Sequence, residues 1–169
     1  MNFDPWGVWM QVLNDAGSSF PLVLNPSGGN VGIGTTSPSE KLYVVGNIYK
    51  TGTVSFVQDH PADSTKEIVY VSLEGGEAGT YIRGEAQLIN GEVKIELPEH
   101  FSLVTATDSG LTAQITPIDE CQGLRIVKVS HNSLVVKELN GGGSNARFYY
   151  LVNGIRKGYE GYNPIKDKL

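Results

Sequence analysis

The sequence predicts an all-β protein in two parts: an intertwined oligomeric β stalk and a β-sandwich or jelly-roll-like head. Glycine contributes 21 of the 169 residues, well above the usual ~7%, which indicates a chain rich in turns. Apolar residues recur with a period of two in many short runs, as in strands with one buried face. No segment of any length shows the 3.6-residue period of an amphipathic helix.

The chain opens with two short apolar runs, Val8–Leu13 and Phe20–Leu24. The polar segment Asn14–Ser19 between them contains glycine, so the three together predict a β-hairpin. Trp6 and Trp9 could form a stacking platform for sugars. We expect them to pack instead, because large aromatic side chains mostly supply buried area.

The stretch Gly28–Ile48 invites comparison with a phosphate-binding loop because Gly32 and Gly34 are closely spaced. A dinucleotide fingerprint needs a third glycine, a preceding strand and a following helix. Here Pro38 and an alternating strand follow. The sequence therefore predicts β structure and no nucleotide site.

Residues 1–58 contain too few large apolar residues to bury a core of their own. Such thin segments need disulfides, metals or oligomerisation. Cys121 is the only cysteine, so it forms no intrachain disulfide, and no metal motif is present. We therefore expect an oligomer whose chains meet at the apolar positions Val31, Ile33, Leu42, Val44, Ile48, Val54 and Phe56.

We expect the head to cover residues 59–160 and a polar tail to cover 161–169. The run Ile68–Leu73 is apolar on both faces, as in a central strand. Further strands are expected at Leu111–Thr116, Leu124–Val129, Leu134–Leu139 and Ala146–Val152. Short strands at regular spacing favour a sandwich or jelly roll.

The clearest local signal is Asn90-Gly91, the dipeptide favoured in two-residue type I′ turns. A hairpin over Tyr81–Leu97 would pair Leu88 with Val93 and bring the apolar sides of both strands together. Its other side is our candidate outward binding face, formed by Tyr81, Arg83, Glu85, Gln87, Lys94 and Glu96. In this register Glu85 would lie opposite Glu96, an unfavourable pairing of like charges.

Composition and motifs exclude several classes of function. A net charge of −5 argues against nucleic-acid binding, which needs clustered cations. No window reaches the ~18 apolar residues of a membrane span. His60, His100 and His131 fall in predicted turns without metal-site spacing, and no G-x-S-x-G elbow accompanies them. We expect no catalytic residues, no metal and no cofactor.

Four acidic residues leave one enzymatic alternative open: Glu74, Glu77, Glu85 and Glu96. Glycoside hydrolysis needs two carboxylates at a defined separation across a cleft. A solvated strand face or salt bridges between chains would use the same residues without any chemistry.

The run Asn30-Val31-Gly32-Ile33-Gly34-Thr35-Thr36-Ser37-Pro38, with Lys41-Leu42 and Val45-Gly46-Asn47-Ile48 after it, resembles the stalk motif of phage tail fibres, tail spikes and related bacterial surface fibres. The part from Asp59-His60-Pro61 to Gly154-Ile155-Arg156-Lys157-Gly158 is similar to the β-rich head that follows this motif in such proteins. Together the two resemblances cover roughly residues 25–160. They imply a homotrimer of parallel chains, located outside the cell on a virion tail or a cell-surface appendage.

These observations predict a structural and receptor-binding module of a tail-fibre-like or adhesin-like protein. Its expected partners are two further copies of the chain, neighbouring fibre domains, and a cell-surface glycan or protein. A glycan-degrading tail spike and a purely structural connector are the alternatives. Because the chain opens inside strand-like sequence, we expect it to be a piece of a longer fibre.

Overall fold

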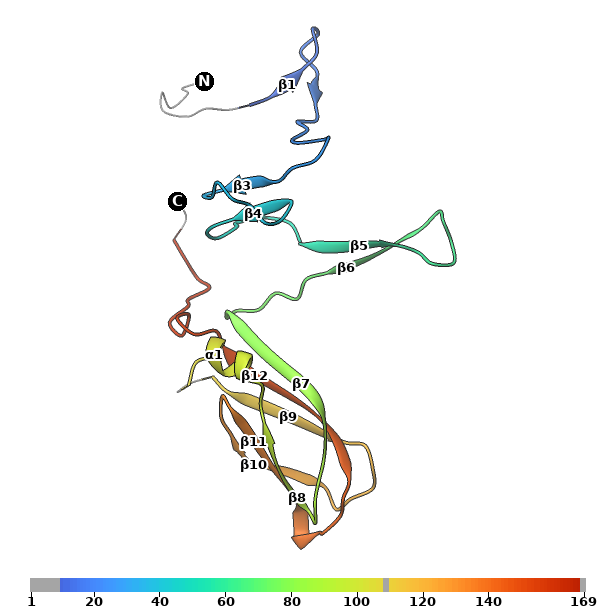
Figure 1. Ribbon diagram of the computed structural model, residues 1–169, viewed down its shortest axis with the longest axis vertical. Coiled ribbons are helices and arrows are strands. Elements are labelled where there is room, and N and C mark those ends of the chain that lie inside the picture. The colour runs from blue at the N-terminus through green and yellow to red at the C-terminus, as the bar shows by residue number, and fades with distance from the viewer. Residues whose placement is uncertain (1–9, 108–109, 168–169) are drawn as a thin grey trace. The chain divides into compact units, whose positions relative to one another are not determined.

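The computed structural model describes residues 10–107 and 110–167, and these consist mainly of β-strands (Figure 1). The prediction of an all-β chain is confirmed for this part. Two units, Met1–Ser72 and Leu73–Leu169, are each described by themselves below. Trp6 and Trp9 lie outside the described residues. No described helix is long and apolar enough to cross a membrane.

The N-terminal unit contains three two-stranded ladders. They are β1 (Val12–Leu13) with β2 (Ser19–Phe20), β3 (Val31–Ile33) with β4 (Leu42–Val44), and β5 (Ser55–Asp59) with β6 (Glu67–Val71). The first is the expected hairpin, and its turn is closed by the Ser18 amide, which donates to Asn14 Oδ1 over 2.8 Å. The second ladder is parallel and the third antiparallel.

The glycine-rich stretch supplies the beginning of the loop that connects the parallel strands β3 and β4. The Asn30 side-chain amide donates to the Pro38 carbonyl over 2.8 Å and closes the loop between β3 and β4. A Cβ on Gly32 would lie 2.5 Å from the Thr35 carbonyl oxygen, and Gly34 has a φ of +74°. Only glycine fits both positions, so the stretch acts as a scaffold.

The third ladder crosses the domain boundary that the sequence suggested. A boundary after residue 58 falls inside β5, whereas the chain divides between Ser72 and Leu73. Phe56 and Tyr70 face each other across the hairpin with ring centroids 5.3 Å apart. Within the described chain β6 pairs with β5 alone, so the expectation of a central strand over Ile68–Leu73 is wrong for a single copy.

None of the described residues 10–72 is buried. Large apolar side chains are nevertheless frequent there, and Ile33, Leu42 and Phe56 are 54%, 58% and 55% exposed. Residues 10–72 of one chain therefore form no hydrophobic core.

The C-terminal unit does have a core, and two three-stranded antiparallel sheets contribute residues to it. Its elements are β7 (Gly79–Gln87), β8 (Glu92–Glu96), α1 (Glu99–Val104), β9 (Thr112–Pro117), β10 (Leu124–Val129), β11 (Ser133–Glu138), η1 (Leu139–Gly141) and β12 (Arg147–Ile155). The sheets have the strand orders β10-β11-β8 and β7-β12-β9. Both contribute to one buried cluster of Leu88, Leu97, Phe101, Leu134, Val136, Ala146, Phe148 and Val152.

The Asn90-Gly91 turn is present, with φ values of +51° and +84°. The long hairpin predicted around it is wrong, because pairing stops at the single bridge between Ile89 and Glu92. Beyond that bridge β7 pairs with β12 and β8 pairs with β11. The apolar sides of β7 and β8 still face one core, but they reach it from different sheets.

This separation removes the expected repulsion between two carboxylates. Glu85 lies opposite Tyr149, and Glu96 lies opposite Ser133. Glu96 forms an ion pair with Lys94 on its own strand.

One buried carboxylate, that of Glu138, holds together two loops at the end of the core. It is 7% exposed and accepts the amide protons of Gln122 over 2.9 Å and Ser144 over 2.8 Å. These backbone hydrogen bonds lower the pKa of Glu138 below its ordinary value, because they stabilise the charged form. A Cβ on Gly142 would lie 2.3 Å from the carboxyl carbon, so glycine is required there.

We predict that Glu138→Gln lowers the melting temperature at pH 7, because one amide proton then faces the NH₂ group of the new side chain. The contribution of a carboxylate with a lowered pKa is complete above the unfolded value of 4.5 and is lost as pH falls through the folded value. The gap between wild type and variant should therefore shrink below pH 4.5 in thermal melts followed by circular dichroism. The exposed Glu120 supplies the control Glu120→Gln, and a gap that is constant with pH would refute the assignment.

Candidate functional site: the outer face of the β7-β12-β9 sheet

The sheet β7-β12-β9 presents one face to the core and one to solvent. Its register pairs Tyr149 with Glu85 and Thr116, Leu151 with Arg83 and Gln114, and Asn153 with Tyr81 and Thr112. Directly paired residues project from the same face of a sheet. These nine side chains therefore form one surface, which we call the outer face, while Phe148 and Val152 point into the core.

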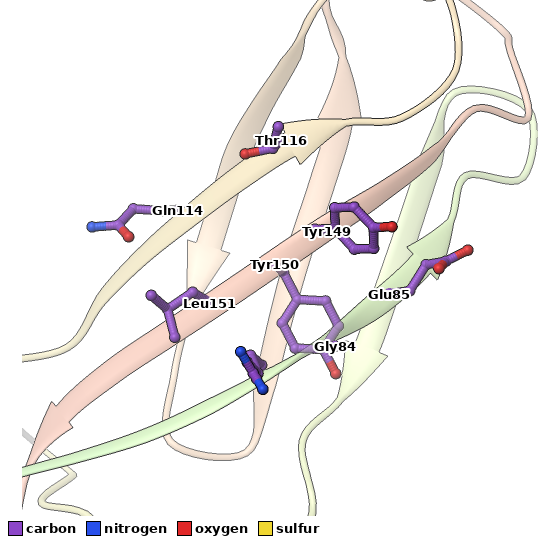
Figure 2. A pocket seen from close by; sticks show the side chains of 8 residues that line it. Gly84, Glu85, Gln114, Thr116, Tyr149, Tyr150 and Leu151 are labelled. Carbon is purple, nitrogen blue, oxygen red and sulfur yellow. The ribbon is translucent and has the colours of Figure 1, made fainter. Parts of the chain in front are cut away.

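The middle of the outer face is hollowed. A cavity of about 600 Å³ is lined by Arg83, Gly84, Glu85, Gln114, Thr116, Tyr149, Tyr150 and Leu151 (Figure 2). The outer-face side chains of this lining are one tyrosine, one guanidinium, one carboxylate, one amide, one hydroxyl and one leucine, whereas Tyr150 pairs with Gly84 on the core side of the sheet and packs against the core. A concave site with a few convergent polar groups is the usual form of a ligand-binding surface.

Gly84 determines where the ring of Tyr150 lies. Tyr150 pairs with Gly84 across the sheet, and Figure 2 shows its ring extending over the strand that carries Gly84. A Cβ on Gly84 would come within 2.6 Å of the Tyr150 hydroxyl and 2.8 Å of the ring carbon Cζ. The missing side chain thus lets the tyrosine cover an edge strand, a known use of aromatic residues beside glycine in sheets.

A second arginine, Arg147, pairs with Gln87 on the same side of the sheet as the nine residues of the outer face, and its guanidinium is fully engaged. Its Nε and Nη2 donate to the two carboxylate oxygens of Asp119, each over 3.0 Å, and Nη1 lies 3.7 Å from Glu85. The hydrogen bonds from Arg147 lower the pKa of Asp119. The guanidinium of Arg83, in contrast, makes no hydrogen bond or ion pair with any residue in the part of the chain that the structure describes.

A second hollow of about 520 Å³ continues along the outer face past Tyr81. Glu74 and Glu77 both line it, together with Asn153. Of the four acidic residues considered as a glycosidase set, these two share a hollow, whereas Glu85 and Glu96 belong to different sheets.

The predicted binding face is therefore only partly assembled. Tyr81, Arg83, Glu85 and Gln87 lie together on exposed positions of β7. Lys94 and Glu96 are exposed on β8 in the other sheet, because the expected hairpin does not continue. Sequence reasoning missed the β12 and β9 residues that complete the face, among them Tyr149, Leu151 and Gln114.

The three histidines lie in different parts of the chain. His60 belongs to the N-terminal unit, His100 lies in α1, and His131 lies between β10 and β11. The described residues contain no group of three or more His, Cys, Asp or Glu side chains that could hold a metal ion. Cys121 is a free thiol packed against the core.

The predicted assembly positions lie in the N-terminal unit. Val31 pairs with Leu42, and Ile33 pairs with Val44, so these four share one face of the parallel ladder. Ile48 and Val54 are 66% and 51% exposed in the segment that follows.

Comparison of the chain with family models, curated proteins and solved structures finds no match.

We predict that Gly84→Ala destabilises the head by about 1–3 kcal/mol, the usual cost of forcing extra volume into a packed position. The cost should fall in a Tyr150→Leu background, because the crowded ring is then absent. Gly79→Ala is the control on the same strand, since its nearest atom would lie 4.0 Å away. Equal costs of Gly84→Ala in both backgrounds, measured by chemical denaturation, would contradict this account of the cavity.

Proposed function

We propose that this chain is a structural and receptor-binding module of a homotrimeric fibre, resembling a phage tail fibre or a surface adhesin and located outside the cell. Residues 10–72 would form the stalk, wrapped around two further copies. The C-terminal unit would be a β-sandwich head that presents the outer face to a cell-surface glycan or protein. The observation that carries the proposal is the absence of any buried residue among the described positions 10–72.

Removing the exposed apolar side chains of residues 10–72 from water would lower the free energy of the protein. Burying one Val, Leu, Ile or Phe side chain contributes about 1.5–3 kcal/mol, and the N-terminal unit exposes many of them. The parallel ladder β3–β4 adds a second reason, because parallel sheets are normally covered on both faces. One copy of the chain leaves this ladder with two strands and open faces.

A further copy of the same chain is the simplest cover. Symmetric assembly buries the same apolar positions on every subunit, and glycines in the stalk allow backbones of different chains to approach closely. The number three comes from the resemblance of the Asn30–Pro38 motif to fibre stalks. Three heads held together would multiply contacts that are individually weak.

One observation favours a second candidate, a glycan-degrading spike. Glu74 and Glu77 line the same hollow, and paired carboxylates are the groups that glycoside hydrolysis requires. A panel of cell-surface glycans scored for both binding and product release separates the two functions. Binding without product supports the receptor-binding module, product formation supports the spike, and a pure connector would do neither.

We predict that Ile33→Asp abolishes assembly, because it places a charge on a face that the proposal buries between chains. Sedimentation velocity should then show single chains in place of the wild-type oligomer. Ser39→Asp is the matched control, since Ser39 is exposed in the same connection between β3 and β4 and should leave assembly intact. An Ile33→Asp variant that sediments like wild type would rule out this face as the assembly surface.

A further inference from the structure

We infer that the 600 Å³ hollow of the outer face recognises the carboxylate of an acidic sugar residue, such as a uronic or sialic acid. The inference rests on the proposed function and narrows its receptor to one chemical class. It starts from Arg83, a guanidinium in the wall of the hollow that no described residue engages.

The geometry of arginine suits this ligand. A guanidinium offers a planar fork of donors that matches a carboxylate in a bidentate arrangement. The same face shows how that arrangement is satisfied internally, since Arg147 binds Asp119 through two 3.0 Å hydrogen bonds. Arg83 has the same fork without an internal carboxylate, so an external one can occupy it.

The neighbouring side chains suit the rest of a sugar ring. Tyr149 is 55% exposed and offers an apolar ring face beside a polar hydroxyl, a combination suited to amphipathic ligands. Gln114 and Thr116 line the same hollow, and their side chains form no hydrogen bond with any described residue. An amide and a hydroxyl can each donate and accept, as recognition of sugar hydroxyl groups requires.

The charges around the hollow favour a ligand that carries one negative charge close to Arg83 over a ligand with many negative charges. Glu85 is the one carboxylate among the described residues that line it, and Arg147 at 3.7 Å partly neutralises that charge. The whole chain carries a net charge of −5, so its long-range field repels polyanions. Selection for acid must therefore come from short-range contact with Arg83, and a nucleic acid or a long polysulfate does not fit this pattern.

The test uses pairs of glycans that differ only in a carboxylate, such as oligosaccharides ending in glucuronate or in glucose, and sialylated glycans paired with the same glycans whose sialic acid carboxylate is converted to a neutral amide. The full chain, Arg83→Gln, Glu85→Gln and Lys94→Gln are compared on one array, with affinities then measured by titration. Lys94→Gln is the matched control, because it removes the same charge from the outward position of β8 in the other sheet. Equal melting temperatures establish that the variants fold.

We expect wild type and Lys94→Gln to prefer the acidic member of a pair. Arg83→Gln should weaken acidic binding by about tenfold or more, the usual consequence of losing a charge-assisted hydrogen bond, with neutral binding unchanged. Glu85→Gln should strengthen acidic binding a few-fold, because it removes the nearby negative charge. This opposite response also tests the inference if Arg83→Gln fails to fold.

Equal binding of acidic and neutral members, or acidic binding that Arg83→Gln leaves unchanged, would overturn the inference. Neither result affects the proposed function, because a glycan is still bound. Failure of every glycan to bind also overturns the inference. Binding of the trimer to whole cells then decides whether the proposed receptor-binding function survives with a protein receptor.

Discussion

The strongest constraint on this molecule is the unfavourable free energy of exposing apolar side chains to water. In residues 10–72 a single chain provides no core in which these side chains could be buried. In the head, alternation along the strands places Phe148 and Val152 inside one cluster shared by two sheets. In the N-terminal unit the same alternation gives ladders of two strands, too thin to enclose anything. The head can therefore fold around its own core, whereas the proposed stalk depends on other copies of the chain.

The construction of the C-terminal unit explains why the outer face of its β7-β12-β9 sheet is not needed for the core. At one end of the core, the buried carboxylate of Glu138 accepts hydrogen bonds from the backbone amides of Gln122 and Ser144. The tight Asn90-Gly91 turn lies at the same end. A Cβ on Gly91 would lie 2.1 Å from the Gly142 carbonyl oxygen, so turn and loop pack directly together. Since these contacts stabilise the fold away from the outer face, that face is free to carry polar and aromatic residues. The spacing of these residues is set by β12, which is hydrogen-bonded to β7 on one side and to β9 on the other.

Local patterns predicted the local structure well. The strand Leu124–Val129 has the predicted bounds, and the hairpin expected near the start of the chain is present as β1 and β2. Pairing between strands was less predictable, because alternation shows which side of a strand is apolar and not which strand lies beside it. The Asn90-Gly91 turn implied that β7 and β8 pair along their length, yet each joins a different sheet. The outer face was half predicted for the same reason: large side chains occupy both sides of β12, so the sequence did not show that Tyr149, which is exposed, and Leu151, which is half-buried, lie on the outer face.

The central claim is that apolar positions of the N-terminal unit are covered by further copies of the chain. The molecular mass of the full chain in solution, measured by light scattering over a range of concentrations, tests it most directly. The account predicts a particle of three chains, each of 18.2 kDa, that persists on dilution. A stable particle of one chain at all concentrations would contradict it.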